Sequence, residues 1–166
     1  MRYKYLIYIL IIILPISLAD CRHRNRDKPE RGHMYFTHKH SVVKMRKADG
    51  VYYVPCKING TEMEFILDTG ASNITMSLTE VLFLYKQRKL TDDDFIGKQQ
   101  YQIADGSIHE GMTVILRKVE IGDWLLNNVQ ASIVNSMEAP LLLGQSALAA
   151  FGKIAIDYNR NEITFE

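Results

Sequence analysis

An aspartate at the end of an apolar strand is the feature of this sequence best suited to chemistry. Asp68 follows the apolar run 65–67 and is followed by Thr69, Gly70 and Ala71. Burying an ionised carboxylate without partners is costly, so core packing alone does not favour an acid here. Gly70 lets backbone amides approach the carboxylate closely, and Thr69 offers a hydroxyl group. The pattern predicts a carboxylate held in a tight turn, although a single Asp-Thr-Gly triplet also fits an ordinary strand-to-turn aspartate.

Two further glycine-containing motifs follow Asp68 along the chain. Ala104-Asp105-Gly106 lies between two strand-like segments, and Asp-Gly is a strong signal for a tight hairpin. Such a hairpin can cover a cleft as a flap, and a plain surface hairpin is the alternative. Leu142-Leu143-Gly144 is an apolar run that ends in a glycine and leads into a short helix.

From Val51 onward the sequence alternates short β-like runs with turns. Asn59-Gly60 predicts a two-residue hairpin turn, because both residues tolerate positive φ. We expect strands over 51–58, 61–67, 74–76, 98–104, 107–117, 119–121, 124–134, 141–143, 154–157 and 162–165, a polar loop over 90–97, and short helices from Ser77 or Thr79 to about 86 and over 145–151. Many short strands with one or two short helices predict an all-β fold, a closed or partly closed barrel.

The three motifs together resemble the retropepsin-like aspartic proteases, in particular the bacterial members of that clan. The resemblance runs from about Val51 to Phe165 and rests on the motifs in order: 68–71 as the active-site loop, 104–106 as the flap tip, and 142–144 as the segment before the C-terminal helix. It implies a closed β fold of one acid-protease lobe. It also implies a homodimer that hydrolyses peptide bonds in a cleft across a two-fold axis, with Asp68 as the catalytic residue.

One catalytic acid in each chain makes a dimer necessary for this chemistry. The reaction needs two carboxyl groups that share a proton across a water molecule: one acts as a base toward the water and the other polarises the scissile carbonyl. The chain holds a single Asp-Thr-Gly, and a two-fold axis beside Asp68 supplies the second copy. We expect terminal strands such as Ile163–Phe165 to pair across this interface.

Two departures from the viral enzymes of the family concern the dimer. Gln145 follows Gly144 where those enzymes carry a bracing arginine, and Ser72 and Asn73 stand where they have two acidic residues. The viral bracing salt bridges are therefore not expected here. The main alternative to a protease is a dimeric peptide-binding module that keeps the fold without cutting, and a third hypothesis is a membrane-tethered adaptor that works through its basic tail.

The sequence favours few partners other than a peptide or protein substrate and a second copy of the chain. Lys and Arg total 20 against 19 Asp and Glu, so the net charge of +1 gives no sign of nucleic-acid binding. Nothing indicates a metal or organic cofactor. The histidines near the N-terminus, at 23, 33, 38 and 40, have no ligand spacing. Leu67, Ile103 and Ile108 are expected to form apolar walls of the cleft and to favour apolar substrate residues.

The N-terminus predicts three parts of the chain: a signal peptide or anchor over 1–19, a basic tether over 20–47, and the protease-like domain over 48–166. The apolar run 5–19 reaches roughly 22 Å as a helix, short of the ~30 Å hydrocarbon core. Cleavage after Ala19, lipidation of Cys21 and a retained anchor stay open. The basic residues after the run would keep a retained domain on the cytoplasmic side. Cys56 alternates with apolar residues on a strand and is expected to be a buried hydrophobe rather than a disulfide partner of Cys21.

Overall fold

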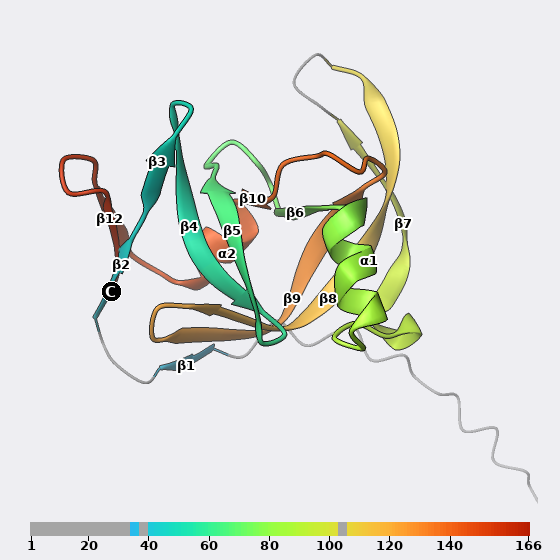
Figure 1. Ribbon diagram of the computed structural model, residues 1–166, viewed down its shortest axis with the longest axis horizontal. Coiled ribbons are helices and arrows are strands. Elements are labelled where there is room, and N and C mark those ends of the chain that lie inside the picture. The colour runs from blue at the N-terminus through green and yellow to red at the C-terminus, as the bar shows by residue number, and fades with distance from the viewer. Residues whose placement is uncertain (1–33, 37–39, 103–105) are drawn as a thin grey trace, which may run out of the picture.

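Hydrogen bonds join most strands of the protein into one sheet that closes on itself. The computed structural model describes residues 34–36, 40–102 and 106–166. In order across the sheet the strands are β1 (Met34–Phe36), β9 (Trp124–Val134), β6 (Ile74–Ser77), β10 (Leu142–Leu143), β5 (Thr61–Leu67), β4 (Val51–Ile58), β8 (Ile108–Ile121) and β7 (Phe95–Gln102), and β3 (Arg46–Ala48) pairs with β4. Because β9 pairs with β8 as well as with β6, the strands form a ring, which is irregular because β10 is so short (Figure 1). The predicted all-β class is confirmed.

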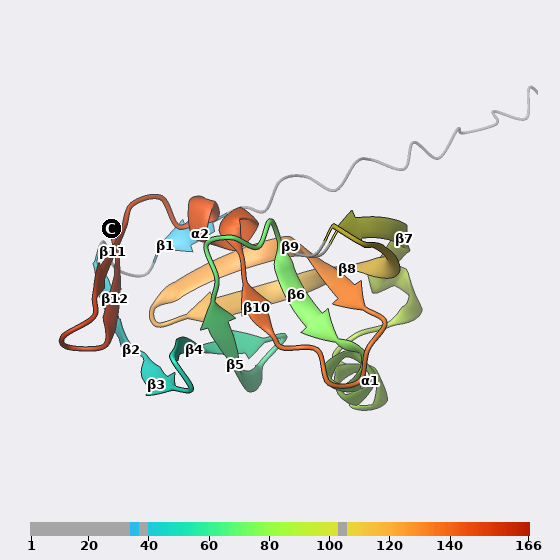
Figure 2. The same cartoon turned by 90° about the horizontal axis from the view of Figure 1, so that it is seen from above.

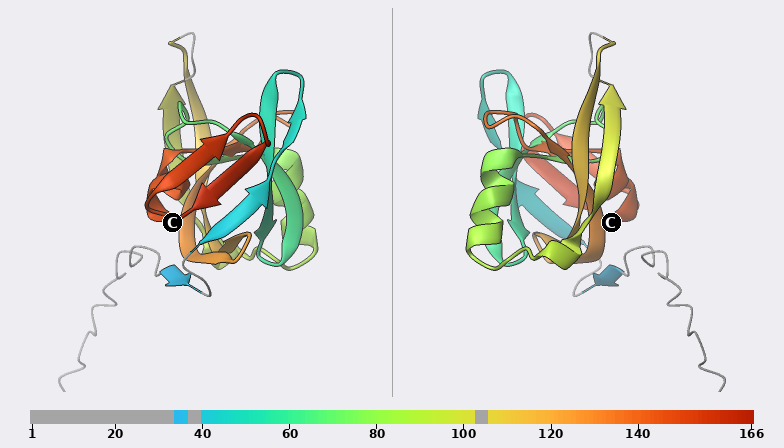
Figure 3. Two further views of the ribbon diagram at one scale, coloured as in Figure 1. Left: turned by 90° about the vertical axis from the view of Figure 1, so that its left-hand side faces the viewer. Right: turned by 90° about the vertical axis from the view of Figure 1, so that its right-hand side faces the viewer.

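A second sheet of three strands lies beside the ring and contains the C-terminus. Its order is β11 (Ile154–Asp157), β12 (Glu162–Phe165) and β2 (Ser41–Lys44), so β12 is hydrogen-bonded on both of its edges within the same chain (Figure 3). The expectation that 163–165 would pair across a dimer interface is therefore wrong. A strand with both edges occupied has no free backbone groups to offer a partner.

Part of the predicted tether belongs to the folded domain. Residues 41–44 and 46–48 form β2 and β3, and the side chains of Val43 and Met45 are buried in the core. The apolar residues between the charged ones alternate with them, which is the pattern of a strand with one buried face. The predicted segment 1–19, residues 20–33 and 37–39 of the tether, Ile103, and flap residues Ala104 and Asp105 lie outside the described residues. No helix in the described part of the chain is long and apolar enough to cross a membrane.

The hairpins follow their sequence signals closely, with two differences in strand length. Asn59 and Gly60 have φ of 49° and 81°, as a two-residue hairpin turn requires. The predicted strands 107–117 and 119–121 are one strand, β8, in which Arg117 and Lys118 are both exposed and the buried face changes phase. The predicted polar loop is shorter than expected, because a 3-10 turn over Asp92–Asp94 leads directly into β7.

Two helices pack on the outside of the strands in the described structure. α1 (Leu78–Lys86) begins at Ser77, whose hydroxyl accepts a hydrogen bond from the Glu80 backbone N–H, and it buries Val81 and Leu84. α2 (Gln145–Ala150) ends at Phe151, whose ring lies 4.8 Å from that of Phe165. The aromatic side chains of Phe151 and Phe165 also contact Trp124 of β9, and these contacts join the small sheet to the ring of strands.

Cys56 is buried in β4 and has no disulfide partner among the described residues. Burial raises the pKa of its thiol far above the ordinary value. The interpretation of this residue as a small hydrophobe is confirmed.

The segment that follows β5 is held by β10. β10 runs parallel to β5 with Leu143 opposite Leu67, and the Asp68 backbone N–H continues the ladder by donating to the Leu143 carbonyl oxygen at 3.2 Å. On its other side β10 pairs with β6 at Thr75, so it fills the gap between the strands before and after residues 68–73 (Figure 2). The predicted apolar strand therefore serves to fix both ends of the turn that carries Asp68.

The first turn of α2 also binds the segment that follows β5. The backbone N–H groups of Gln145 and Ser146 donate to the carbonyl oxygens of Ala71 and Ser72 at 2.8 and 2.9 Å. The first N–H groups of any helix lack partners within the helix, and here the turn supplies them. The Gln145 side chain adds a third bond of 3.0 Å to the Thr69 carbonyl oxygen.

The aromatic contact of the last strand leads to a first prediction. Replacing the fully buried Phe165 by Ala is expected to lower the free energy of unfolding by about 3–5 kcal/mol, because the ring fills the space between Phe151 and Trp124. Val42→Ala is the control on the neighbouring strand, where the side chain is 51% exposed, and it should cost about 0.5 kcal/mol or less. Urea unfolding at one protein concentration measures both; equal costs would contradict the assigned packing.

Gly144 gives a second prediction, because the close approach of α2 to the turn leaves no room for a side chain. A Cβ at this residue would lie against the Asn73 carbonyl oxygen and 2.7 Å from that of Ala71. Gly144→Ala should therefore destabilise the protein by about 1–3 kcal/mol and displace residues 71–73. Ser146→Ala, an exposed change in the same helix, should leave the unfolding midpoint nearly unchanged. Equal midpoints for the two variants would show that the turn is not held by this contact.

Candidate active site

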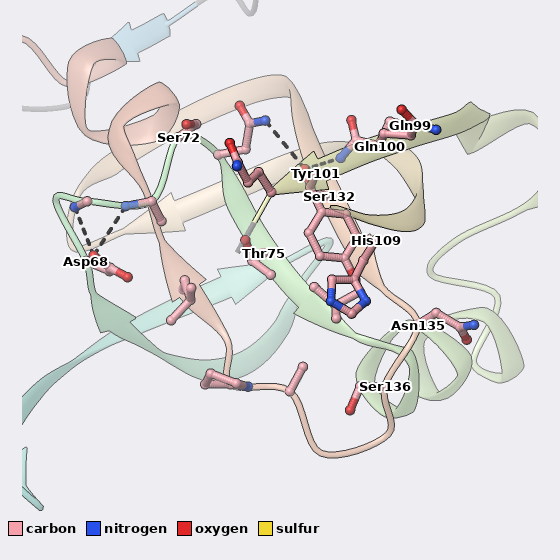
Figure 4. Close-up of a pocket in the computed structure, with 18 of the residues that line it drawn as sticks. Asp68, Ser72, Thr75, Gln99, Gln100, Tyr101, His109, Ser132, Asn135 and Ser136 are labelled. Atoms are coloured by element: carbon pink, nitrogen blue, oxygen red, sulfur yellow. Dashed lines mark hydrogen bonds between the residues drawn. The ribbon is translucent and has the colours of Figure 1, made fainter. Parts of the chain in front are cut away.

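The Asp68 carboxylate is held by one oxygen and open at the other. Oδ1 accepts the backbone N–H groups of Gly70 at 2.9 Å and of Ala71 at 3.3 Å (Figure 4). No donor among the described residues reaches Oδ2, and the side chain is half-buried at the wall of a cleft. Thr69 and Gly70 are exposed at the tip of the turn. Backbone amides thus orient the carboxylate while leaving one oxygen available to a water molecule or a substrate.

The β7–β8 hairpin forms the opposite wall of this cleft and projects from the body of the ring (Figure 1). Tyr101 and His109 are cross-strand partners whose rings stack at a centroid distance of 5.8 Å, and both line the cleft. Gly106, with φ of 86°, also lines it, and its carbonyl oxygen accepts a bond from the Gln102 side chain. The predicted flap motif therefore faces the Asp68 turn at Gly106, while Ala104 and Asp105 lie outside the described residues.

The cleft between these walls has a volume of about 1350 Å³, above the ~300–1,000 Å³ typical of small-molecule pockets. Its size and open shape suit an extended chain. Its walls come from the Asp68 turn, β6, β7, β8, the end of β9 and the segment leading to β10. Most of its side chains are amides and hydroxyls: Ser72, Asn73, Thr75, Gln99, Gln100, Gln102, Ser132, Asn135 and Ser136.

The residues expected from the sequence to form apolar walls do not line the described cleft, whose apolar lining comes from other residues such as Val134, Pro140 and Leu142. Leu67 is not among the lining residues, and Ile108 is 67% exposed and also lies outside the lining; Ile103 is not described. In β8 the side chain that faces the cleft near the tip is that of His109. Strand alternation places neighbouring residues on opposite faces, and the sequence alone did not indicate which face of this hairpin looks inward.

Sequence reasoning missed a set of polar side chains that link the walls. Thr113 of β8, Gln99 of β7, Ser132 of β9 and Asn73 of the turn are joined by hydrogen bonds between side chains. One signal was available in the sequence: Ser132 interrupts the apolar residues Ala131 and Ile133. In the structure all three residues are buried, so β9 is covered on both faces here. A polar residue at such a position indicates a polar layer on one of those faces.

Among the described residues, no group of three or more His, Cys, Asp or Glu side chains is arranged to hold a metal ion. Gln145, which stands where viral relatives carry an arginine, reaches Thr69 within its own chain. Leu142 lines the cleft, Leu143 is buried, and Gly144 packs under the turn, so the third predicted motif contacts the first directly.

Comparisons with known proteins agree with this arrangement. The model of one protein family, described as "gag-polyprotein putative aspartyl protease", matches residues 54–150, from β4 through α2. A retropepsin-like aspartic protease from Rickettsia conorii has a similar solved structure, with a TM-score of 0.53 and 18% sequence identity over 81% of this chain and 94% of that chain. At this identity the likeness shows the fold. No curated protein matches the chain significantly.

The family match covers more than half of the chain and includes the Asp68 turn, the flap hairpin and the segment that holds the turn. The chain therefore belongs to the retropepsin-like aspartyl protease family.

Proposed function

We propose that this chain is an aspartic endopeptidase that hydrolyses peptide bonds as a homodimer, with Asp68 of each subunit as the catalytic residue. The observation that carries the proposal is the state of the Asp68 carboxylate: two backbone amides fix Oδ1, and Oδ2 faces a cleft large enough for a peptide. Asp157 makes the same two turn bonds at the end of β11, so what distinguishes Asp68 is its position at the wall of the cleft. Membership of the aspartyl protease family supports the same reaction.

The reaction follows from two such carboxyl groups. One carboxylate accepts a proton from a bound water molecule, and the oxygen of that water attacks the carbonyl carbon of the scissile peptide bond. The other carboxyl group is protonated and donates a hydrogen bond to the carbonyl oxygen, which gains negative charge in the tetrahedral intermediate. A proton then passes to the leaving nitrogen as the C–N bond breaks. Two like charges this close cannot both ionise easily, so the pair shares one proton as a unit.

The second carboxyl group comes from a second copy of the chain in this proposal. The sequence has one Asp-Thr-Gly, and its Thr69 and Gly70 are exposed at the tip of the turn, where an isologous contact would place them against their own copies. β12 is already paired on both edges, so the subunits must meet through other surfaces. The free edges of the small sheet in the described structure are those of β2 and β11.

The β7–β8 hairpin acts as the flap in this proposal. It faces Asp68 across the cleft, and Gly106 has a positive φ that glycine adopts without strain at the tip. Closure over an extended peptide would exclude water other than the reacting molecule and add backbone hydrogen bonds to the substrate.

The catalytic role of Asp68 is tested by Asp68→Asn. An asparagine Oδ1 can still accept the N–H groups of Gly70 and Ala71, so the variant should fold normally while losing cleavage of a diverse peptide pool by about 10³-fold. Asp93→Asn is the control, because Asp93 is exposed and lies outside the cleft. Mass spectrometry of the pool measures cleavage, and near-UV circular dichroism checks the fold. If neither wild type nor variant cuts but both bind peptides, the chain is the non-cutting binding module.

The need for two subunits is tested by mixing. A tenfold excess of Asp68→Asn subunits should trap most wild-type subunits in mixed dimers and reduce their activity to about a tenth, since pairing follows mass action. The same excess of serum albumin is the control. The specific activity of wild type alone should also rise with its concentration until the dimer is saturated. Constant specific activity down to a particle shown to be monomeric by analytical ultracentrifugation would contradict the shared site.

A further inference from the structure

A continuous set of side-chain hydrogen bonds joins the flap hairpin to the Asp68 turn. The Thr113 hydroxyl donates to Gln99 Oε1 at 2.7 Å, and Gln99 Nε2 donates to Ser132 Oγ. Asn73 Nδ2 donates to the same Ser132 oxygen at 3.4 Å, so two bonds converge on Ser132 (Figure 4). We call these four residues the amide–hydroxyl network.

Ser132 has a hydrogen atom left to donate. A serine oxygen has two lone pairs and one O–H, and here the side-chain amides of Gln99 and Asn73 occupy both lone pairs. No acceptor in the described part of the chain takes the Ser132 hydrogen. The residue is only 8% exposed, yet it lines the cleft. Because Ser132 lines the open cleft, its hydrogen is accessible to an acceptor that enters the cleft, whether water or a group of the substrate.

The strand register surrounds Ser132 with further hydroxyl groups. Ser132 of β9 is directly opposite Thr113 of β8 and directly opposite Thr75 of β6. The three residues thus form a row of hydroxyls across three neighbouring strands, on the face of β9 that looks into the cleft. Thr75 is half-buried and also lines the cleft. A polar row in this position has no use in packing the core, which the neighbouring Ala131 and Ile133 help to form.

An acceptor lies beside this donor. The Asn73 side chain uses its Nδ2 for Ser132, and its Oδ1 has no donor among the described residues. Oδ1 and Nδ2 belong to the same planar amide, so the free acceptor is fixed close to the Ser132 hydroxyl. A carboxamide has an acceptor oxygen and an N–H donor side by side, which is the complement of this pair.

We propose that the Ser132–Asn73 pair forms a specificity pocket for a carboxamide side chain, glutamine or asparagine, of the substrate. This inference rests on the proposed protease function and names the substrate class for it. The substrate's carbonyl oxygen accepts the Ser132 hydrogen, and its NH₂ group donates to Asn73 Oδ1. The network holds both protein groups in place before the substrate arrives, so little freedom is lost on binding.

Other substrate side chains fit this pocket less well. An apolar side chain would cover the Ser132 hydroxyl and leave it buried without an acceptor, and sites built to hydrogen-bond a ligand reject analogues that lack the group. Among the described residues that line the cleft, Asp68 is the one carboxylate and His109 the one imidazole. A basic substrate side chain therefore finds no acid apart from the one assigned to the reaction.

The test uses paired peptides that differ only by glutamine or methionine, two side chains of similar length, at each position around the scissile bond in turn. Wild type should cleave the glutamine peptide with a kcat/KM about tenfold higher at one of these positions. Ser132→Ala should reduce that ratio to about one, mainly by slowing the glutamine peptide. Ser146→Ala, an exposed change outside the cleft, should keep the full ratio.

A second variant keeps the test decisive if Ser132→Ala is poorly folded. Asn73→Asp retains the shape of the side chain but replaces Nδ2 by an acceptor, which would take the Ser132 hydrogen and remove the donor from the cleft. It should also abolish the preference for glutamine. A ratio near one at every position in wild type, or a ratio that survives in both variants, would overturn the proposal. A ratio near one in wild type is the result expected if the Gln99 amide is turned by 180°, because its oxygen would then accept the Ser132 hydrogen.

Binding separates this inference from the proposed protease function. Isothermal titration of the peptide pairs with Asp68→Asn reports the preference without cleavage. If Asp68→Asn prefers the glutamine peptide in binding while wild type cleaves no peptide, the pocket is supported and the proposed protease function is contradicted. If wild type cleaves peptides but neither assay shows a preference for glutamine, the protease function is supported and the pocket is contradicted.

Discussion

The site depends on how the backbone of residues 68–73 satisfies its hydrogen bonds. The segment leaves β5 without a neighbouring strand of its own, and a turn that exposes its carbonyl and amide groups inside a protein must find partners. β10 continues the ladder to Asp68, and the first turn of α2 donates to Ala71 and Ser72. The same contacts satisfy the N–H groups that a helix start leaves unpaired. The turn 68–73 and the start of α2 thus satisfy each other's backbone groups, and these bonds fix the turn that orients the carboxylate.

This dependence explains why the three sequence motifs occur together. Residues 142–143 form the strand that pairs with the end of β5. Glycine is the only residue type that leaves room at position 144 for the carbonyl oxygens of Ala71 and Asn73, so α2 can approach the turn closely. The flap hairpin stands on the other side of the cleft, and in the described residues side-chain hydrogen bonds of Gln99, Ser132 and Asn73 join it to the turn. Backbone contacts therefore hold the acid, whereas side-chain contacts connect it to the hairpin proposed as the flap. That division suits a site in which one wall must open while the acid stays in place.

Local signals in the sequence predicted much of the fold, and long-range pairing decided the rest. The Asn59-Gly60 turn, the cap at Ser77 and the aspartate at the end of an apolar strand act through neighbours in the chain, so composition and spacing sufficed for them. The place of β12 depends on residues 41–44, more than a hundred positions away, whose charged neighbours resemble a solvated tail. The amide–hydroxyl network draws on four separate segments, and each member alone looks like an ordinary polar residue. The residues that line the cleft were missed for the same reason: the face on which a side chain lies depends on register, which a single strand does not reveal.

The buried thiol of β4 bears on how this domain reacts with oxidants. In the described residues, stability comes from packed side chains and paired strands, with no covalent cross-link between them. Cys56 is enclosed by the core and its thiol is far from forming the reactive thiolate. Oxidants in solution therefore reach Cys56 only when the core opens, so the rate at which this thiol is modified reports opening of the domain.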